Sequence, residues 1–349
     1  MLGGVSALTH RSLDEAVRDI HAPLWLRRHP ELGWRAEQSP SLAAEIIAPA
    51  CAPTTLGGGD FCRAHGVRFP YMTGAMARGI ASVELVKAAA EAGLLGVLGA
   101  AGLRPEVVLK AIHALKRHLA ERPYAINLIF SPQETGQEAH LCELFLREEV
   151  RCVAASAYVD LTPQLVRYRF HGARLLPDGR VQLPNRLIAK VSRRELAEKF
   201  LSPPSEKLLR EVVAAGFLTE RQASIAAGQP MAEDVTVEAD SGGHTDRRPA
   251  ISALPEVVAL RDRLCREHGY RARPRVGAAG GIASPWALAG AFALGANYVV
   301  SGSINQACVE AGTSPQAKAM LCEASATDCA MAPAADMFEM GAKVQVLKR

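Results

Sequence analysis

From Tyr71 onward, short apolar runs alternate with longer amphipathic segments. Short, predominantly apolar runs are typical of parallel strands that are covered on both faces. The eight runs are residues 71–74, 96–99, 125–130, 152–156, 187–191, 235–239, 276–279 and 298–301. The segments between them, such as 82–92 and 105–119, carry apolar residues at helical spacing. Eight strand-and-helix repeats predict an α/β fold, a TIM (β/α)₈ barrel. An open doubly wound sheet is the competing architecture.

The first 66 residues do not follow this rhythm. They contain helical patterns at 12–20 and 41–47, and then a Gly57-Gly58-Gly59 run. We interpret that run as a loop that no helix follows. We therefore expect an N-terminal extension over 1–66 and a barrel domain over 67–349.

Two long inserts surround the fifth predicted strand, at 161–186 and 200–233. The second is rich in Glu, Lys, Arg and Ala, which predicts a helical insert within about residues 195–233. Because inserts that follow barrel strands lie on the active-site face, we expect this one to form a lid or a substrate-binding cap.

Composition narrows the class of protein. The 349 residues are 49% hydrophobic and 22% charged, which excludes disorder over most of the chain. A net charge of +4, spread along the chain, and only 5% aromatic residues disfavour nucleic-acid binding. The weak positive charge suits phosphorylated partners such as a nicotinamide cofactor or a phosphopantetheine arm. The eight cysteines form no C-x-x-C pair and no metal-binding spacing, so we expect reduced thiols, no metal and a cytoplasmic protein.

Barrel enzymes hold their active sites at the carboxyl ends of the strands, so the residues there carry the functional prediction. The segment Gly74-Ala75-Met76-Ala77 follows the first strand, and its small residues would let a flat ligand approach the backbone, although a tight turn also uses glycine. Asn127 lies within an apolar strand and needs partners for its amide. Lys190 ends another strand, where a buried cation needs an anion. That anion is either a ligand or a neighbouring carboxylate, Glu238 or Asp240.

The segment Ser241-Gly242-Gly243-His244 follows the sixth strand. Two glycines allow a sharp turn that would place the imidazole at the barrel mouth. Histidine titrates near neutral pH and can donate a proton or polarise a carbonyl group. Among the ten histidines, His244 alone follows a buried strand with glycines before it.

Glycine turns end the last two strands. Gly280-Gly281-Ile282 follows the seventh strand and Gly302-Ser303 follows the eighth. Barrel proteins often bind phosphate at this position through backbone N–H groups, and a Cβ would block the anion. The pair of turns therefore predicts a phosphate site.

Several segments resemble the PfaD-type flavin-dependent enoyl reductases, which act in trans with polyketide and polyunsaturated fatty acid synthases. These reductases are related to nitronate monooxygenases and to flavin-dependent bacterial enoyl-acyl-carrier-protein reductases. The resemblance runs from about residue 71 to 349. It rests on segments 74–82, 98–103, 238–246 (EADSGGHTD), 276–282 (VGAAGGI), 302–308 and 331–337 (MAPAADM). Family members usually continue beyond a segment like 343–349, which suggests that the C-terminal region is truncated.

The resemblance implies FMN as cofactor and assigns residue roles. Ala75, Met76 and Asn127 would contact the isoalloxazine ring and Lys190 its N1/O2 edge, while His244 would be the catalytic residue near N5. The FMN phosphate would lie on the two glycine turns. The complete set of expected cofactor-binding residues is Gly74, Ala75, Met76, Asn127, Lys190, Ser241, Gly242, Gly243, Gly280, Gly281, Ile282, Gly302 and Ser303.

The implied function is that of a trans-acting enoyl reductase, with NADPH or NADH as hydride donor. It would reduce α,β-unsaturated thioesters carried on acyl carrier protein domains, and the resemblance also makes a homodimer plausible. The alternative is a nitronate monooxygenase that uses the same flavin site. A third hypothesis is a barrel without flavin that only docks within a synthase, and the intact glycines and His244 disfavour it.

Overall fold

The computed structural model describes residues 12–37, 44–131, 135–242, 245–334 and 343–348. The chain divides into two compact units, Met1–Gly59 and Asp60–Arg349.

The described residues of the first unit form a three-stranded antiparallel sheet and one short helix. Helix α1 (Leu13–Arg18) begins at Ser12, whose side chain forms a capping box with Glu15. Strand β1 (Leu24–His29) lies between β2 (Gly33–Glu37) and β3 (Ile46–Ala48). The helix expected at 41–47 is wrong where the structure describes it, because Ile46 and Ile47 pair with β1. Two adjacent β-branched residues favour this extended conformation.

Helix α2 (Gly59–His65) begins at the last glycine of the run, so the expectation that no helix follows it is wrong. Its Phe61 ring is fully buried and stacks on Tyr298 at 4.3 Å, inside the second unit. The helix therefore packs with the barrel, and the boundary between the units falls at Gly59 rather than near residue 66.

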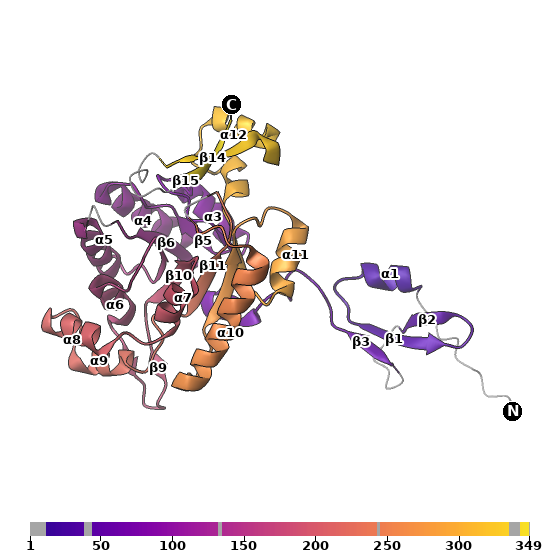
Figure 1. The fold of residues 1–349 in the computed structure, drawn as a ribbon, viewed down its shortest axis with the longest axis horizontal. Coiled ribbons are helices and arrows are strands. Elements are labelled where there is room, and N and C mark those ends of the chain that lie inside the picture. The colour runs from indigo at the N-terminus through magenta and orange to yellow at the C-terminus, as the bar shows by residue number, and fades with distance from the viewer. Residues whose placement is uncertain (1–11, 38–43, 132–134, 243–244, 335–342, 349) are drawn as a thin grey trace. The chain divides into compact units, whose positions relative to one another are not determined.

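The second unit is a closed barrel of eight parallel strands, which confirms the fold predicted from the sequence (Figure 1). The strands are β4 (Tyr71–Thr73), β5 (Gly96–Leu98), β6 (Tyr124–Ile129), β7 (Cys152–Ser156), β10 (Arg186–Val191), β11 (Asp234–Glu238), β12 (Arg275–Ala279) and β13 (Tyr298–Ser301). Their order is β4-β13-β12-β11-β10-β7-β6-β5. A parallel bridge between Met72 and Leu95 joins the two ends of this order and closes the barrel.

Alternate residues of each strand face opposite sides of the barrel wall. One set forms a cluster inside the barrel, with Ala125, Ala154 and Ile188 among its members. The other set, which includes Val153 and Leu187, packs against the surrounding helices in the larger core. Both faces are therefore apolar, and this explains why the strands read as continuous apolar runs.

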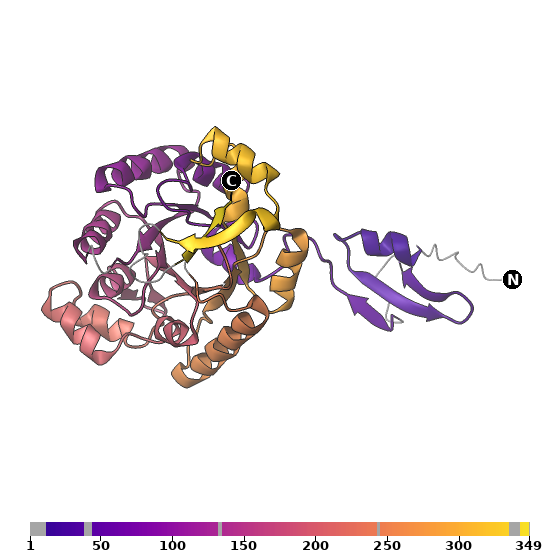
Figure 2. The same cartoon turned by 45° about the horizontal axis from the view of Figure 1, so that its top comes forward.

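Helices surround the barrel, as the end-on view shows (Figure 2). They are α3 (Val83–Glu91), α4 (Pro105–Leu119), α5 (Thr135–Arg147), α6 (Pro163–Phe170), α7 (Arg194–Leu201), α10 (Ala250–His268) and α11 (Pro285–Ala293). Helix α4 shows the packing rule, because Val108, Ile112, Leu115 and Leu119 are buried at helical spacing. No helix among the described residues is long and apolar enough to cross a membrane.

The insert around β10 contains a small hairpin, β8 (Arg174–Leu175) with β9 (Val181–Gln182), and two helices, α8 (Glu206–Ala214) and α9 (Glu220–Ala226). The two helices leave the barrel after Ser202 and return at Met231, whose N–H donates to the Ser202 carbonyl at 3.0 Å. That position is three residues before β11 begins, at the amino ends of the strands. The prediction that this insert forms a lid is therefore wrong, because helix α7 runs from the carboxyl ends of the strands back to their amino ends before the insert begins.

The segment that does lie over the carboxyl ends comes from the end of the chain. It contains η1 (Ser303–Ala307), α12 (Pro315–Glu323), η2 (Ala326–Asp328) and the antiparallel pair β14 (Cys329–Pro333) and β15 (Lys343–Leu347). Figure 2 shows this strand pair in yellow across the end of the barrel. Gln345 N–H donates to the Gly242 carbonyl at 3.1 Å, which ties β15 to the loop after β11.

A buried ion network lies at the opposite end of the barrel. The Asp234 carboxylate accepts hydrogen bonds from Arg275 Nε at 2.6 Å and Arg275 Nη2 at 2.8 Å, and it lies 2.9 Å from His65 Nε2. Burial alone would raise the pKa of the Asp234 carboxyl, but the charges and hydrogen bonds of His65 and Arg275 outweigh it and hold that pKa well below its usual range. The network joins α2 to β11 and β12, and no pattern in the sequence indicated it.

Candidate functional site

A layer of polar side chains lines the inside of the barrel near the carboxyl ends. Asn127 and Lys190 each follow an inward-facing apolar residue by two positions, as does Ser156. Asn127 is only 3% exposed, and its Nδ2 donates to the Ala154 carbonyl and to Ser156 Oγ, both at 3.0 Å. Both amide protons are thereby placed, which leaves the side-chain carbonyl as the group that can accept from a ligand.

Lys190 forms an ion pair across two neighbouring strands. Its Nζ lies 3.0 Å from Glu238 Oε1, and the two side chains are 16% and 20% exposed. This carboxylate is one of the two anionic neighbours that the sequence left open. The Glu238 carboxylate neutralises the charge of Lys190 within the polar layer. The contact of Lys190 with a cofactor stays a prediction.

The segment after β4 lies against the loop after β13. Gly74 N–H donates to the Ser301 carbonyl at 2.7 Å, and a Cβ on Gly74 would come within 2.7 Å of Gly302 Cα. The backbone of Gly99 packs closely against Met76, because a Cβ on Gly99 would lie 1.7 Å from the Met76 carbonyl oxygen. Gly74 and Gly99 are therefore needed to bring these backbones together, and the sequence pattern did not single out Gly99 for this role.

The two glycine turns are adjacent in space. Ser301 Oγ donates to the Ile282 carbonyl at 2.6 Å and thereby joins the end of β13 to the turn after β12. Gly280 and Gly281 have φ values of +94° and +68°. A Cβ on Gly280 would lie 2.8 Å from the carbonyl oxygens of Ala239 and Asp240. Glycine is thus required at 280 by the end of β11, whereas the space beside Gly281 is open.

The loop after β11 is fixed on both sides of the predicted catalytic residue. Gly243 and His244 themselves lie outside the described residues. Before them, Gly242 lies between Gln345 and Ser303, each of which has an atom 3.5 Å from the position of a Cβ. After them, Asp246 accepts two hydrogen bonds from Arg193 at 2.8 Å each and one from Ser192 at 2.7 Å. The hydrogen bond from Arg193, with that from Ser192, lowers the pKa of the Asp246 carboxyl against a smaller effect of burial.

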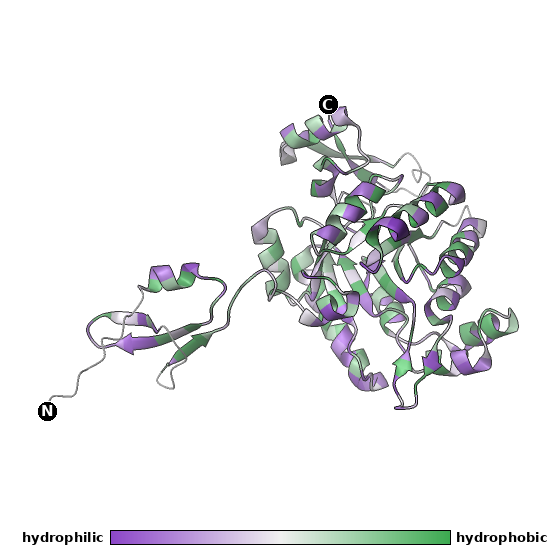
Figure 3. Cartoon of the chain, turned by 180° about the vertical axis from the view of Figure 1, so that it is seen from behind, coloured by the Kyte–Doolittle hydropathy of each residue, from purple (hydrophilic) through white to green (hydrophobic). Residues whose placement is uncertain are grey.

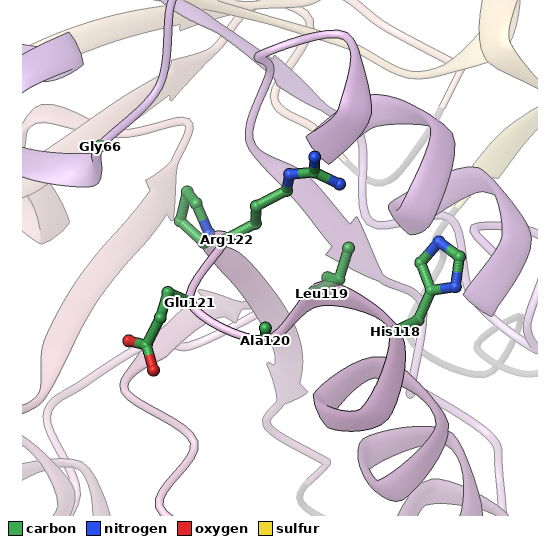
Figure 4. Close-up of a pocket in the computed structure, with 7 residues that line it drawn as sticks. Gly66, His118, Leu119, Ala120, Glu121 and Arg122 are labelled. Carbon is green, nitrogen blue, oxygen red and sulfur yellow. The ribbon is translucent and has the colours of Figure 1, made fainter.

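Two pockets lie outside this polar layer. One, of about 500 Å³, is lined by Gly66 and by residues 118–123 at the end of α4, next to the amino end of β6 (Figure 4). It contains none of the predicted site residues. The other, of about 370 Å³, lies between α10 and α11 and touches the turn from Gly280 to Ile282. Among the described residues, no group of three His, Cys, Asp or Glu side chains could hold a metal ion.

The structure brings most of the expected residues to one end of the barrel. A Cβ on Gly74 would overlap Gly302 Cα, and a Cβ on Gly242 would lie 3.5 Å from Ser303 Oγ, so these segments lie side by side. The inward spacing places Asn127 and Lys190 in the same layer. Ser156 and Gln345 were not identified from the sequence. Ser156 could have been found, because it follows Cys152 and Ala154 at the strand period of two. Gln345 could not, because its contact joins segments about a hundred residues apart.

The closed parallel barrel, with its polar layer and glycine turns at the carboxyl ends, defines the class of (β/α)₈-barrel proteins that bind ligands there. Comparison with known sequences narrows this class. The family model described as nitronate monooxygenase matches residues 62–340. The chain belongs to this nitronate monooxygenase family, and the resemblance predicted from the sequence is confirmed.

Relatives add detail. The chain is 45% identical to a polyunsaturated fatty acid synthase polypeptide of Thraustochytrium sp. over 99% of its own length and 23% of the relative's. It is 41% identical to the polyketide biosynthesis protein PksE of Bacillus subtilis over 99% of its length and 44% of the relative's. The chain thus spans less than half the length of these curated relatives.

One solved structure is similar across most of the chain. The enoyl reductase domain of MlnA, from the macrolactin biosynthesis cluster of Bacillus amyloliquefaciens, is 40% identical with a TM-score of 0.82. The match covers 85% of this chain and 67% of that one. FabK from Thermotoga maritima, at 24% identity and a TM-score of 0.57, shares the fold, and the match covers 83% of this chain and 74% of that one.

Proposed function

We propose that this chain is an FMN-dependent enoyl reductase that serves a polyketide or polyunsaturated fatty acid synthase. The observation that carries the proposal is the similarity to the MlnA enoyl reductase domain over 85% of this chain. Relatives from a fatty acid synthase and from polyketide biosynthesis support it. The overall reaction would consume an α,β-unsaturated thioester, NADPH or NADH, and one proton, and would yield the saturated thioester and the oxidised nicotinamide.

The described residues fit FMN. The paired turns at Gly281 and Gly302 offer backbone N–H groups without side chains, which suits a phosphate. Asn127 is a buried amide whose carbonyl is available to a ligand, which suits a ring N–H. FMN, when bound, supplies hydride transfer between nicotinamide and substrate.

This chain's residues would divide the remaining work. Ala75 and Met76 would lie against the flat ring, with Gly74 holding their segment on Gly302. Ser303 and Ile282 would complete the phosphate site. Lys190, which pairs with Glu238, would face negative charge on the ring edge.

His244 would act on the substrate thioester. Reduction at the β-carbon leaves negative charge on the thioester oxygen and requires a proton at the α-carbon. A histidine can stabilise that oxygen by donating a hydrogen bond, or it can donate the proton itself. Ser241 and Gly242 precede it in the loop that β15 holds.

The second candidate is nitronate oxidation, which the description of the matching family model favours. The same flavin site and His244 would serve it, with O₂ as oxidant. The two functions differ in the substrate, and one preparation can therefore test both.

The test begins with the visible spectrum of the purified protein, where bound flavin absorbs near 450 nm as a general property of the group. Under anaerobic conditions, a crotonyl thioester on acyl carrier protein should be reduced at the expense of NADPH or NADH. Oxygen uptake with propionate-3-nitronate but no enoyl reduction would instead establish the second candidate. A colourless protein that cannot be reconstituted with FMN would refute both.

The replacement Gly74→Ala should weaken FMN binding. Its Cβ would overlap Gly302 Cα, so the two loops would separate at a cost of about 1–3 kcal/mol, as for other overpacked sites. FMN content and the dissociation constant of added FMN measure the effect. Gly136→Ala is the matched control, because a Cβ there meets nothing within 4 Å, and FMN binding should be unchanged. Equal FMN affinity in both variants would contradict the assigned place of Gly74.

A further inference from the structure

Ser156 and Tyr158 face opposite sides of the barrel wall although they are only two residues apart. Ser156 lies in the polar layer inside the barrel, where its Oγ accepts a hydrogen bond from Asn127 at 3.0 Å. Tyr158 is 3% exposed and belongs to the larger core, between the barrel and its helices. In a regular strand, residues two apart face the same side. The alternation of β7 is therefore broken at Ala157.

Ala157 breaks this alternation in a strained backbone conformation. Its φ is +61°, in the left-handed region that glycine adopts more readily than alanine. Strained backbone of this kind persists only where the surrounding structure holds it, and it clusters at functional sites. Contacts on both sides of Ala157 are therefore needed to keep the turn in place.

A buried carboxylate holds the far side of this turn. Glu138, in the first turn of α5, is 7% exposed, and its Oε1 accepts hydrogen bonds from Tyr158 at 2.9 Å and from Thr162 at 2.5 Å. Thr162 is also the N-cap residue of α6, so one oxygen joins the turn to the beginnings of two helices. The barrel strands beside it are largely apolar, as their green colour in Figure 3 shows, and a carboxylate buried there needs such donors.

We infer that Glu138 is a positioning residue for the amide of Asn127. Its hydrogen bond from Tyr158 holds the turn at Ala157 in place. That turn directs Ser156 into the barrel, where the serine oxygen holds one amide proton of Asn127. The side-chain carbonyl of Asn127 then has a single orientation toward a ligand. The inference rests on the proposed function only in the contact between Asn127 and the flavin ring.

The dissociation constant of added FMN tests this role with the full chain. Tyr158→Phe keeps the buried ring and removes its hydroxyl group. It should raise the dissociation constant by about 3- to 10-fold, the range for loss of one hydrogen bond. Glu138→Gln keeps an oxygen that can accept from Tyr158 and should bind FMN nearly as well as wild type. Glu138→Leu has no such oxygen and should weaken FMN binding as Tyr158→Phe does.

Tyr168→Phe is the matched control. Tyr168 is fully buried on α6, and its hydroxyl donates to the Val150 carbonyl at 2.7 Å, just before the amino end of the same strand. Both tyrosine variants should lose similar stability in denaturant unfolding, but only Tyr158→Phe should lose FMN affinity. Loss of affinity in neither variant, or in both to the same extent, would overturn the inference.

The side-chain amide of Asn127 provides a second readout, which needs no flavin. Its two protons are identified in ¹H–¹⁵N NMR spectra of the FMN-free chain by their absence from Asn127→Ala. They should exchange with solvent faster in Tyr158→Phe than in wild type, and at the wild-type rate in Tyr168→Phe. A chain that shows this difference but binds no FMN would refute the proposed function and support the positioning role. Unchanged exchange in Tyr158→Phe would overturn that role.

Discussion

Replacing Asp234 by asparagine is expected to lower the free energy of unfolding by about 3–5 kcal/mol, as for other buried ion pairs that lose one partner. The Asp234 side chain is fully buried, and Arg275 is only 11% exposed. Asparagine keeps the size of the side chain but removes its charge. The guanidinium of Arg275 would then remain buried without a counter-charge.

Denaturant unfolding measures this loss, and two further variants make it specific. Asp178→Asn removes an exposed carboxylate that pairs with Arg180, and stability should not change measurably. The double variant D234N/R275Q removes the unpaired charge and should recover part of the loss. A D234N protein as stable as wild type would contradict the network's contribution.

The same carboxylate predicts a pH dependence. Its pKa is lowered in the folded state by His65 and Arg275 against the effect of burial, so the unfolded chain binds this proton more readily. The stabilisation is complete above the unfolded pKa of about 4 and is lost as the pH falls below it toward the folded pKa. The difference in stability between wild type and D234N should therefore shrink in acid.

Replacing His244 by alanine is expected to lower kcat for enoyl reduction by about 10²- to 10⁴-fold, the range for loss of a general acid. FMN content should be retained, because the loop is held separately through Gly242 and Asp246. His118→Ala is the matched control. That histidine lies in an exposed pair with Glu91, and its replacement should leave kcat unchanged.

A second replacement separates the two possible roles. Glutamine at 244 can donate a hydrogen bond to a carbonyl oxygen but cannot deliver a proton. Substantial activity in His244→Gln would therefore identify carbonyl polarisation, and activity as low as in His244→Ala would identify proton donation. An alanine variant that binds FMN and turns over at the wild-type rate would exclude His244 from the reaction.

Much of the barrel could be predicted from local sequence, because each strand carries its signal within five or six residues. All eight predicted runs coincide with strands to within one or two residues, from Tyr71 to Ser301. The failures have local causes too. The pattern at 41–47 contains Ile46 and Ile47, which pair in a sheet. The glycine run also led us to miss helix α2, because the helix buries its residues by packing against the barrel.

Within the site, the sequence by itself determined which residues end the strands. Gly74, Lys190 and the glycine turns follow from the rule that barrel sites lie at the carboxyl ends, and Asn127 was identified as an amide within an apolar strand. It also determined the chemistry available there, since a buried amide and a buried cation each require a partner.

Only the tertiary structure decided which partners those residues have. It selected Glu238 over Asp240 as the anion beside Lys190, and it placed β15 rather than the α8–α9 insert over the barrel mouth. It also assembled His65, Asp234 and Arg275 from three distant segments. The physical reason is that periodicity reports the environment of each residue alone. Ion pairs and hydrogen bonds depend on distances of about 3 Å, and these distances are set only when the folded chain brings distant segments together.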